Sequence, residues 1–355
     1  MNNKSNQAYD ALALFSGGLD SILAIKLIQT QGLKVLGLHF ISPFFGHPEK
    51  ITLWEVNYGL SLFPVDVSTD FVSMLTEGPQ NGLGKILNPC VDCKILMLAA
   101  AKNMLTQYQA SFIISGEVLG QRPMSQRTDT LNIIKRDADV KNILVRPLSA
   151  RHLRPTDPEK KGIVSREKLK AFSGRGRKNQ IRLAKQFNID PIPTPAGGCL
   201  LTEKESAKRY VPVLEKKKDP QPDDFYLANT GRQFWNKDYW LCIGRDKEDN
   251  ERIAKLATDN DYLINLKFFP GPLGLARPVN DKAWPEDVLA SACKVLSRFS
   301  PRARQSNRKV DLVVQKGSWE KEFAVWPGEL QSLQWQEPVW KKPFNPDKTE
   351  VKHTI

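Results

Sequence analysis

The chain has 355 residues, 41% of them hydrophobic, and a formal net charge of +13, a composition typical of soluble globular proteins. No apolar run approaches the about 18 residues of a membrane span, and residues 1–9 are polar and contain no signal core, so we expect a cytoplasmic protein without a membrane partner. The positive charge favours a polyanionic partner, and five cysteines in that compartment favour metal or redox chemistry over disulfides.

The first half of the chain alternates segments with strand and helix patterns, which predicts an α/β fold with a mostly parallel sheet. In chain order we expect a strand at Ala11–Phe15, a helix at Ile22–Ile28, strands at Lys34–Phe40 and Ser61–Val67, a helix at Val91–Tyr108, and strands at Phe112–Ser115 and Ile143–Val145. Ligands of such sheets bind at the carboxyl ends of the strands.

The most informative segment is Ser16-Gly17-Gly18-Leu19-Asp20-Ser21, which lies between the first strand and the first helix. A glycine-rich turn that leads into a helix directs backbone N–H groups toward an anion, and glycines allow close approach of a phosphate. It is not a Walker A loop, because Gly84-Lys85 is followed by Ile86. The alternative is a helix that is merely capped by Ser and Asp.

Two further loops leave predicted strands at their carboxyl ends, where they could face the same ligand. They are Leu38-His39-Phe40-Ile41-Ser42-Pro43 and Ser115-Gly116-Glu117-Val118-Leu119-Gly120-Gln121-Arg122. His39 is open to two interpretations, a core histidine or a site residue. Glu117 at a strand exit is harder to explain by packing alone.

The second half of the chain shows a looser pattern, which predicts a smaller α+β domain. We take the charged, Pro-bearing segment Glu215–Pro222 as the linker. The predicted domains are therefore residues 1–215 and 221–335, followed by a flexible tail over residues 336–355. After the linker we expect strand-like pieces at Phe225–Leu227, Tyr239–Ile243 and Leu263–Phe268, and a helix at Asn250–Ala257.

Three of the five cysteines are expected to be presented to a ligand. Cys90 and Cys93 form a CxxC at the start of a helix, where the helix N-terminus lowers a thiol pKa, and Cys199 follows a Gly-Gly turn. Cys242 and Cys293 lie in apolar patterns typical of buried residues. Three cysteines can hold a [4Fe–4S] cluster with one open iron. The alternatives are zinc completed by Asp92 or a histidine, and a catalytic dithiol without metal.

The ordered motifs SGGLDS, LHFISP and SGEVLGQ resemble the PP-loop domain of ThiI-type tRNA 4-thiouridine synthetases, over about residues 8–150. The resemblance implies a Rossmann-like fold of the adenine nucleotide alpha hydrolase type that binds ATP with Mg²⁺ and adenylates a tRNA uridine. It places Asp20 among the catalytic residues. The ATP-binding residues that it implies are Ser16, Gly17, Gly18, Asp20, Ser21, Phe40, Ser42, Gly116 and Gln121.

The three cysteines resemble the cluster site of iron–sulfur-dependent tRNA thiolases of the TtuA type, which makes Cys90, Cys93 and Cys199 the expected metal ligands and catalytic cysteines. The pattern IGRDxxxN at Ile243–Asn250 resembles the NFACT-R RNA-binding domain. Basic residues also gather in the C-terminal half, at Arg298, Arg302, Arg304, Arg308 and Lys309. The expected RNA-binding residues are Arg175, Arg177, Lys178, Arg182, Arg232 and Arg245.

These observations together predict an ATP-dependent tRNA sulfurtransferase that replaces a uridine oxygen with sulfur, with 4-thiouridine favoured over 2-thiouridine. The expected sulfur donor is sulfide or a persulfide from a cysteine desulfurase, and whether the chain forms a homodimer is left open. The alternatives are another PP-loop ligase or amidotransferase, which needs no presented cysteines, and an RNA-binding adaptor without activity.

Overall fold

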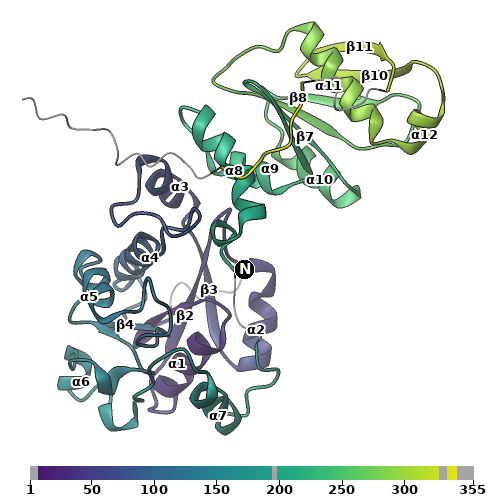
Figure 1. Cartoon of the computed structure of the whole chain (residues 1–355). Coiled ribbons are helices and arrows are strands. Elements are labelled where there is room, and N and C mark those ends of the chain that lie inside the picture. Colours follow the sequence, from purple (N-terminus) through teal and green to yellow (C-terminus); the bar gives the residue numbers. More distant parts are fainter. Residues whose placement is uncertain (1–6, 194–197, 328–333, 342–355) are drawn as a thin grey trace, which may run out of the picture. The chain divides into compact units, whose positions relative to one another are not determined.

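The computed structural model describes residues 7–193, 198–327 and 334–341. The chain divides into two compact units, Met1–Thr202 and Glu203–Ile355, which are treated separately below (Figure 1). The boundary therefore lies before the Pro-bearing segment Glu215–Pro222 that the sequence suggested as a linker. That segment instead joins two helices of the second unit.

The first unit contains a parallel sheet of five strands in the order β3-β2-β1-β4-β5. The strands are β1 (Ala11–Phe15), β2 (Val35–Ile41), β3 (Ser61–Asp66), β4 (Phe112–Ser115) and β5 (Leu144–Val145). The helices are α1 (Leu19–Gln29), α2 (Ile51–Tyr58), α3 (Ser68–Glu77), α4 (Cys90–Met104), α5 (Thr128–Asp137), α6 (Asp157–Lys160) and α7 (Lys178–Gln186). The parallel α/β fold is confirmed.

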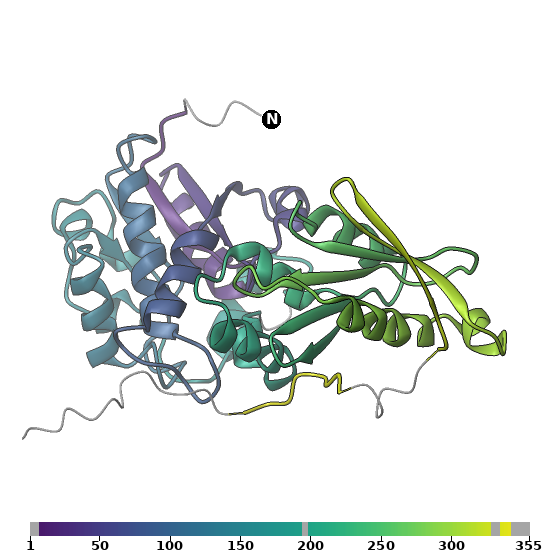
Figure 2. The ribbon, with the colours of Figure 1, turned by 90° about the horizontal axis from the view of Figure 1, so that it is seen from above.

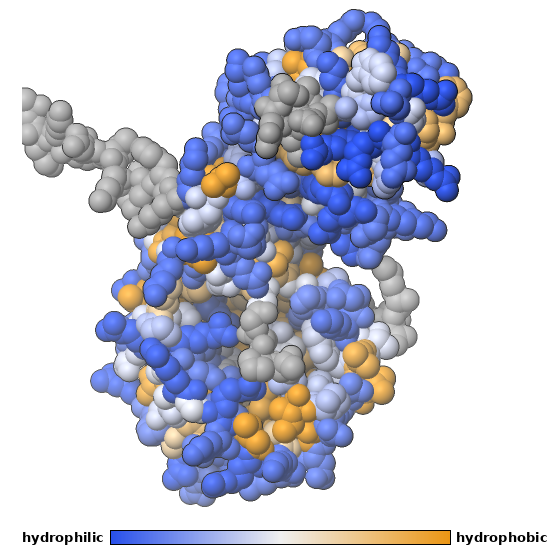
Figure 3. Space-filling view, turned by 45° about the vertical axis from the view of Figure 1, so that its right-hand side comes forward, coloured by the Kyte–Doolittle hydropathy of each residue, from blue (hydrophilic) through white to orange (hydrophobic). Residues whose placement is uncertain are grey.

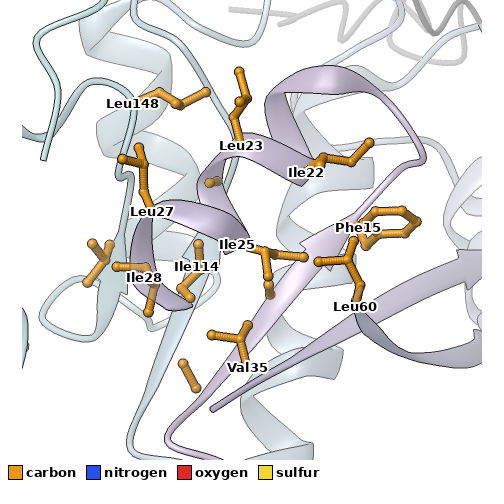
Figure 4. Close-up of a cluster of buried hydrophobic side chains, with 14 of the residues drawn as sticks. Phe15, Ile22, Leu23, Ile25, Leu27, Ile28, Val35, Leu60, Ile114 and Leu148 are labelled. Carbon is orange, nitrogen blue, oxygen red and sulfur yellow. The ribbon is translucent and has the colours of Figure 1, made fainter. Parts of the chain in front are cut away.

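Both faces of this sheet are buried, because alternate residues of each strand enter different cores. Ala11, Ala13 and Phe15 of β1 pack with α1 and α7, and Figure 4 shows the apolar side chains of α1 against the strands. Leu12 and Leu14 enter the core that includes α4 and α5. Burial on both sides explains why the strands are continuous apolar runs in the sequence.

The second unit contains an antiparallel sheet of six strands in the order β11-β10-β8-β9-β7-β6. The strands are β6 (Arg232–Asn236), β7 (Tyr239–Ile243), β8 (Tyr262–Leu266), β9 (Gly274–Pro278), β10 (Val310–Lys316) and β11 (Trp319–Val325). The helices are α8 (Lys204–Lys216), α9 (Pro222–Asn229), α10 (Lys247–Leu256), α11 (Glu286–Arg298) and α12 (Pro301–Gln305). Helix α11 runs along the sheet (Figure 2) and fills its main core with Leu289, Val295 and Leu296.

Two expectations for the second half were wrong. Phe225–Leu227 is helical, because Pro222 begins α9 and the side chains of Gln221 and Asp224 form a capping box around its first turn. The tail does not begin loosely at residue 336, since the backbone of Gln336 exchanges hydrogen bonds of 2.8 and 2.9 Å with Trp235. Residues 342–355 of the expected tail lie outside the described residues.

Candidate nucleotide and cysteine site

The glycine-rich loop occupies the three residues between β1 and α1. Strand β1 ends at Phe15 and α1 begins at Leu19, with Gly18 as the N-cap residue. Ser21 Oγ donates to the Gly18 carbonyl at 2.7 Å, and the Gly18 N–H donates to Ser16 Oγ at 3.4 Å, so the two serines brace the turn. No described side chain caps α1 at Gly18. The first-turn N–H groups are therefore suited to an anionic ligand.

Two glycines of the predicted site are required by close packing. Gly17 has φ +75°, and a Cβ there would lie 2.5 Å from the indole ring of Trp54. A Cβ on Gly116 would lie 2.7 Å from the carbonyl group of Asp20. The loop after β4 can therefore approach the first turn of α1 only because residue 116 is glycine. This places the exits of β1 and β4 in contact.

Asp20 is the buried acidic group of this loop. Its Oδ2 accepts a hydrogen bond of 3.1 Å from Gln121 Nε2, whereas Oδ1 is buried and has no hydrogen-bond partner among the described residues. Burial raises the pKa of the Asp20 carboxyl, while the bond from Gln121 and the nearby Arg177 and Arg122 guanidinium groups act to lower it. An orphaned carboxylate oxygen at a phosphate loop is a fitting ligand for Mg²⁺.

Sequence reasoning missed two residues of this site and gave a third another role. Arg122 and Gln180 lie close enough to Asp20 to affect its pKa, and so does Arg177, which we had grouped with the RNA-binding residues. Gln180 is 1% exposed; its amide lies near enough to Asp20 to lower the pKa of that carboxyl, but makes no hydrogen bond of standard geometry among the described residues. The position of Arg122 directly after Gln121 was the available signal. Gln180 gave none, because only the packing of α7 against α1 brings it to the loop.

The remaining predicted nucleotide residues shape the exit of β2, the strand beside β1. The Phe40 ring is buried in the core and leaves only its backbone for a ligand. Ser42 Oγ accepts from the Phe44 N–H at 3.1 Å and closes a turn. His39 is a core histidine: its Nε2 accepts from the His47 N–H at 2.8 Å, so Nδ1 carries the proton and donates to the Phe15 carbonyl at 3.2 Å.

The three presented cysteines belong to the first unit, and backbone hydrogen bonds bring the third one to the other two. Cys90 begins α4 and Cys93 lies one turn further. Residues 194–197, which include Gly197 of the expected Gly-Gly turn, lie outside the described residues. Directly after Cys199, the Leu200 N–H donates to the Phe44 carbonyl at 2.9 Å, and the Leu201 carbonyl accepts from the Leu87 N–H at 3.2 Å. These bonds fix the Cys199 segment between the β2 exit and the CxxC.

The expected low pKa at the helix start was wrong for Cys93. Burial raises the pKa of the Cys93 thiol to about 12, and the proximity of Cys199 and Cys90 raises it further while Lys94 acts to lower it. Desolvation outweighs the helix N-terminus at this position. The mutual influence of the three thiols shows that they are neighbours.

Asp92, one of the two kinds of fourth ligand that the zinc alternative names, is engaged elsewhere. Asp92 accepts hydrogen bonds from the backbone N–H and the side-chain amide of Asn81 at 3.0 and 3.1 Å. In the part of the chain that the structure describes, no three His, Cys, Asp or Glu side chains are arranged to hold a metal ion. This includes Cys90, Cys93 and Cys199, so the cluster, like the zinc alternative, remains a prediction from the donor chemistry of three thiols. Cys242 and Cys293 are fully buried, as predicted.

A buried ion pair connects the cysteines with the loop. Arg146 Nε donates to Glu117 Oε2 at 2.9 Å, and both side chains are nearly inaccessible. Burial would raise the pKa of Glu117, but Arg146 and Lys94 lower it below its ordinary value. Lys94, which follows Cys93, thus lies close to both Cys93 and Glu117. The cysteines and the glycine-rich loop therefore belong to the same edge of the sheet.

Some of the predicted RNA-binding side chains are exposed to solvent, and others are hydrogen-bonded within the fold. Arg175, Lys178 and Arg182 are exposed on and before α7. Arg232 donates to the Gly244 carbonyl at 3.1 Å, and Arg245 forms hydrogen bonds of 2.6 and 3.1 Å with Asp249. The last two side chains are therefore already engaged within the second unit, and their role in RNA binding stays a prediction.

Comparison with known proteins matches each unit to a different family. Residues 7–152 match the family described as thiamine biosynthesis protein (ThiI), and residues 231–335 match the NFACT protein RNA binding domain. Both resemblances inferred from the motifs are thus confirmed. The loop, the CxxC and Glu117 lie within the first match, whereas Cys199, Arg177 and Gln180 lie in the part of the chain that neither match covers.

One curated relative is a probable tRNA sulfurtransferase of Thermococcus kodakarensis, which is 28% identical over 148 residues. The match covers 39% of this chain, and the chain spans only 36% of that relative's length. The solved structures include the U34-tRNA thiolase NcsA from Methanococcus maripaludis with its [4Fe-4S] cluster (14% identity, TM-score 0.30, 63% of this chain and 71% of that chain). They also include the C-terminal part of a fibronectin/fibrinogen-binding protein from Streptococcus suis (15% identity, TM-score 0.25, 44% and 76%).

Proposed function

We propose that this chain is an ATP-dependent tRNA sulfurtransferase, which adenylates a uridine carbonyl oxygen and replaces it with sulfur. The observation that carries the proposal is that the cysteines and the Ser16–Ser21 loop belong to the same sheet edge: Lys94, which follows Cys93, lies near Glu117, and the adjoining Gly116 packs against Asp20 of the loop. A PP-loop ligase or amidotransferase needs the loop but has no use for three gathered thiols. The likeness of residues 7–152 to ThiI proteins supports the tRNA reaction.

The first half of the reaction uses the loop. The N–H groups at the start of α1 and the Arg122 and Arg177 guanidinium groups would bind the phosphates of ATP, and the unpaired oxygen of Asp20 would hold Mg²⁺, which would supply further positive charge there. The uridine oxygen then attacks the α-phosphate, and pyrophosphate leaves with its negative charge stabilised by these groups. The adenylated oxygen is a good leaving group and departs as AMP.

The second half needs a sulfur nucleophile from sulfide or a donor persulfide. Cys90, Cys93 and Cys199 would hold a [4Fe–4S] cluster, whose open iron supplies a binding place for sulfide. Without the cluster, the half-buried Cys93 remains a neutral thiol at physiological pH, since desolvation raises its pKa to about 12. The NFACT-type unit supplies the contacts to the tRNA. Within this proposal, the ThiI-like loops favour 4-thiouridine as the product.

Cysteine variants test the cluster and the reaction together. Cys90→Ser, Cys93→Ser and Cys199→Ser are each expected to lower the iron and labile sulfide of anaerobically purified protein and to abolish tRNA thiolation. Cys293→Ala in the core of the second unit is the matched control and should keep both. A colourless, zinc-loaded wild-type protein would contradict the cluster.

Nucleoside analysis tests the function itself. Mass analysis of tRNA from a strain without this protein should show the loss of one thiolated uridine, and its identity separates 4-thiouridine from 2-thiouridine. Purified protein should release pyrophosphate from ATP only when tRNA is present. An adaptor without activity would release none, and survival of every thiolated nucleoside would disprove the sulfurtransferase.

A further inference from the structure

One stretch of the second unit is basic without any acidic residue. Residues 288–310 contain six Lys or Arg and no Asp or Glu. Five of these cations lie near one another in sequence at the end of α11, on α12 and before β10: Arg298, Arg302, Arg304, Arg308 and Lys309. Among the described residues, none of the five takes part in an ion pair, although many other Lys and Arg side chains of this unit do.

The loop between β8 and β9 packs against this stretch. Ser300, the N-cap residue of α12, donates from Oγ to the Pro270 carbonyl at 2.7 Å and accepts from the Ala303 N–H at 3.3 Å. The Arg308 guanidinium lies 5.7 Å from the centre of the Phe269 ring. The loop and the basic stretch therefore form one continuous surface, which we call the α12 surface and define as Phe268 together with the five cations.

Phe268 gives this surface an unusual feature. Its side chain is 66% exposed, whereas the neighbouring Phe269 packs partly against the core. The face of the second unit seen in Figure 3 is mostly hydrophilic. Phe268 is the most exposed of the described aromatic side chains that stand out from this unit, ahead of Trp326 and Trp319. The cation nearest the Phe268 ring is the Lys267 ammonium, 5.3 Å from its centre, and the Arg308 guanidinium lies over the next ring of the same loop, Phe269. An exposed aromatic ring in a loop that also contacts cations suits one ligand chemistry in particular, a base that stacks on the ring and phosphates that pair with the cations.

The flat face of the outer strands is a poorer candidate for RNA. In the β10–β11 ladder, Val313 pairs with Glu322 and Gln315 pairs with Glu320, and Asp311 shares the face of Val313. The acidic groups of this face repel phosphates, and Lys267 is already paired with Glu322 at 2.5 Å. The contrast between the two surfaces favours the α12 surface.

We propose that the α12 surface binds an unpaired segment of RNA, with phosphates on Arg302, Arg304 and Arg308 and one unstacked base on Phe268. The inference rests on the proposed function for the identity of RNA as the polyanion. It deepens that proposal, because it assigns the recognition to arginines that take part in no ion pair among the described residues, whereas Arg232 and Arg245 are held by hydrogen bonds within the fold.

Binding of RNA to the full chain tests the inference without any need for catalysis. The probe is an in vitro transcribed tRNA, measured over a series of salt concentrations. The triple variant R302Q/R304Q/R308Q should bind at least tenfold more weakly, and the slope of log K against log salt should fall by roughly 2 to 3, as expected for three lost phosphate contacts. F268A should weaken binding roughly tenfold and leave the salt slope unchanged.

The matched control removes the same charge from α10, in the variant K247Q/R252Q/K255Q. Two of these side chains are paired with Glu251 and Glu248 in the folded unit, and this variant should bind nearly as well as wild type. Thermal melting verifies that every variant is folded. Equal losses in the two triple variants would overturn the inference, because binding would then follow net charge alone.

Competition experiments separate RNA from other polyanions. A hairpin with an unpaired loop should displace the tRNA more effectively than a blunt duplex of equal length or polyphosphate, and F268A should remove the preference. No preference in the wild type would overturn the inference. The proposed function fails separately: a chain that binds hairpins through Phe268 but thiolates no tRNA contradicts the sulfurtransferase and leaves the α12 surface established.

Discussion

At the scale of single residues, the buried carboxylate of Asp20 lowers the free energy of unfolding of the first unit when it is ionised. Its carboxylate is buried with one oxygen unpaired, and burial raises its pKa above the ordinary 3.8. The unfolded chain therefore loses this proton more easily than the folded chain does. Ionisation of Asp20 destabilises the fold above the ordinary pKa, and the penalty reaches its full size above the raised pKa.

Replacement of the charge should reverse this effect. We expect Asp20→Asn to raise the melting temperature at pH 7 by about 2–4 °C, which corresponds to roughly 1 kcal/mol, while pyrophosphate release is lost. The gain should vanish below pH 3.8, where both states are protonated. The exposed Glu77→Gln serves as the control and should change neither property. A melting temperature that falls in D20N would contradict the unpaired-carboxylate interpretation.

At the scale of elements, His39 joins the end of β1 to the loop after β2. Its two nitrogens bond the Phe15 carbonyl and the His47 N–H, which is possible only for the neutral ring. Burial lowers its pKa below 6.5, so the unfolded chain binds a proton that the folded chain resists. The stability from this contact is complete above pH 6.5 and is lost as the pH falls through the lowered pKa.

We therefore expect the free energy of unfolding to fall between pH 7 and pH 5, measured by urea denaturation. His39→Gln retains a donor and an acceptor without a titrating group, so its stability should change less over that interval. The exposed His152→Gln should behave as the wild type does. An equal pH response in H39Q and wild type would show that another group is responsible.

The elements also show what the sequence could predict. Ala11–Phe15 and Phe112–Ser115 were predictable because strands buried on both faces are continuous apolar runs. Phe225–Leu227 was misread because its aromatic residues favour strands, whereas the capping box at Gln221 and Asp224 begins a helix. Where the apolar pattern fits both a strand and a helix, the capping residues determine which of the two forms.

For the site, contiguous motifs were predictable and tertiary neighbours were not. The Ser16–Ser21 loop could be recognised because all its parts are adjacent in the chain. Gln180 could not, because its place beside Asp20 depends on the packing of α7 on α1. The role of Gly116 was also hidden, since the sequence suggested a ligand contact and the structure shows a close approach to Asp20.

At the scale of the whole molecule, the two units have separate cores and no described helix is long and apolar enough to cross a membrane. We expect calorimetry to resolve two unfolding transitions. Mg²⁺ and ATP at about 100 times the dissociation constant should stabilise only the first unit, by about 2.7 kcal/mol. A single transition that shifts as a whole would show that the units unfold together.

Because Trp54 packs on Gly17, its fluorescence can serve as an intrinsic probe of the Ser16–Ser21 loop. Trp54 is the one tryptophan before residue 203, and the other seven all follow Thr202. Its indole lies against the phosphate loop and within 5.0 Å, centroid to centroid, of the His39 ring. The difference in fluorescence between wild type and W54F therefore isolates the loop from every other indole, so binding of ATP at the proposed site can be followed in real time, with or without added tRNA.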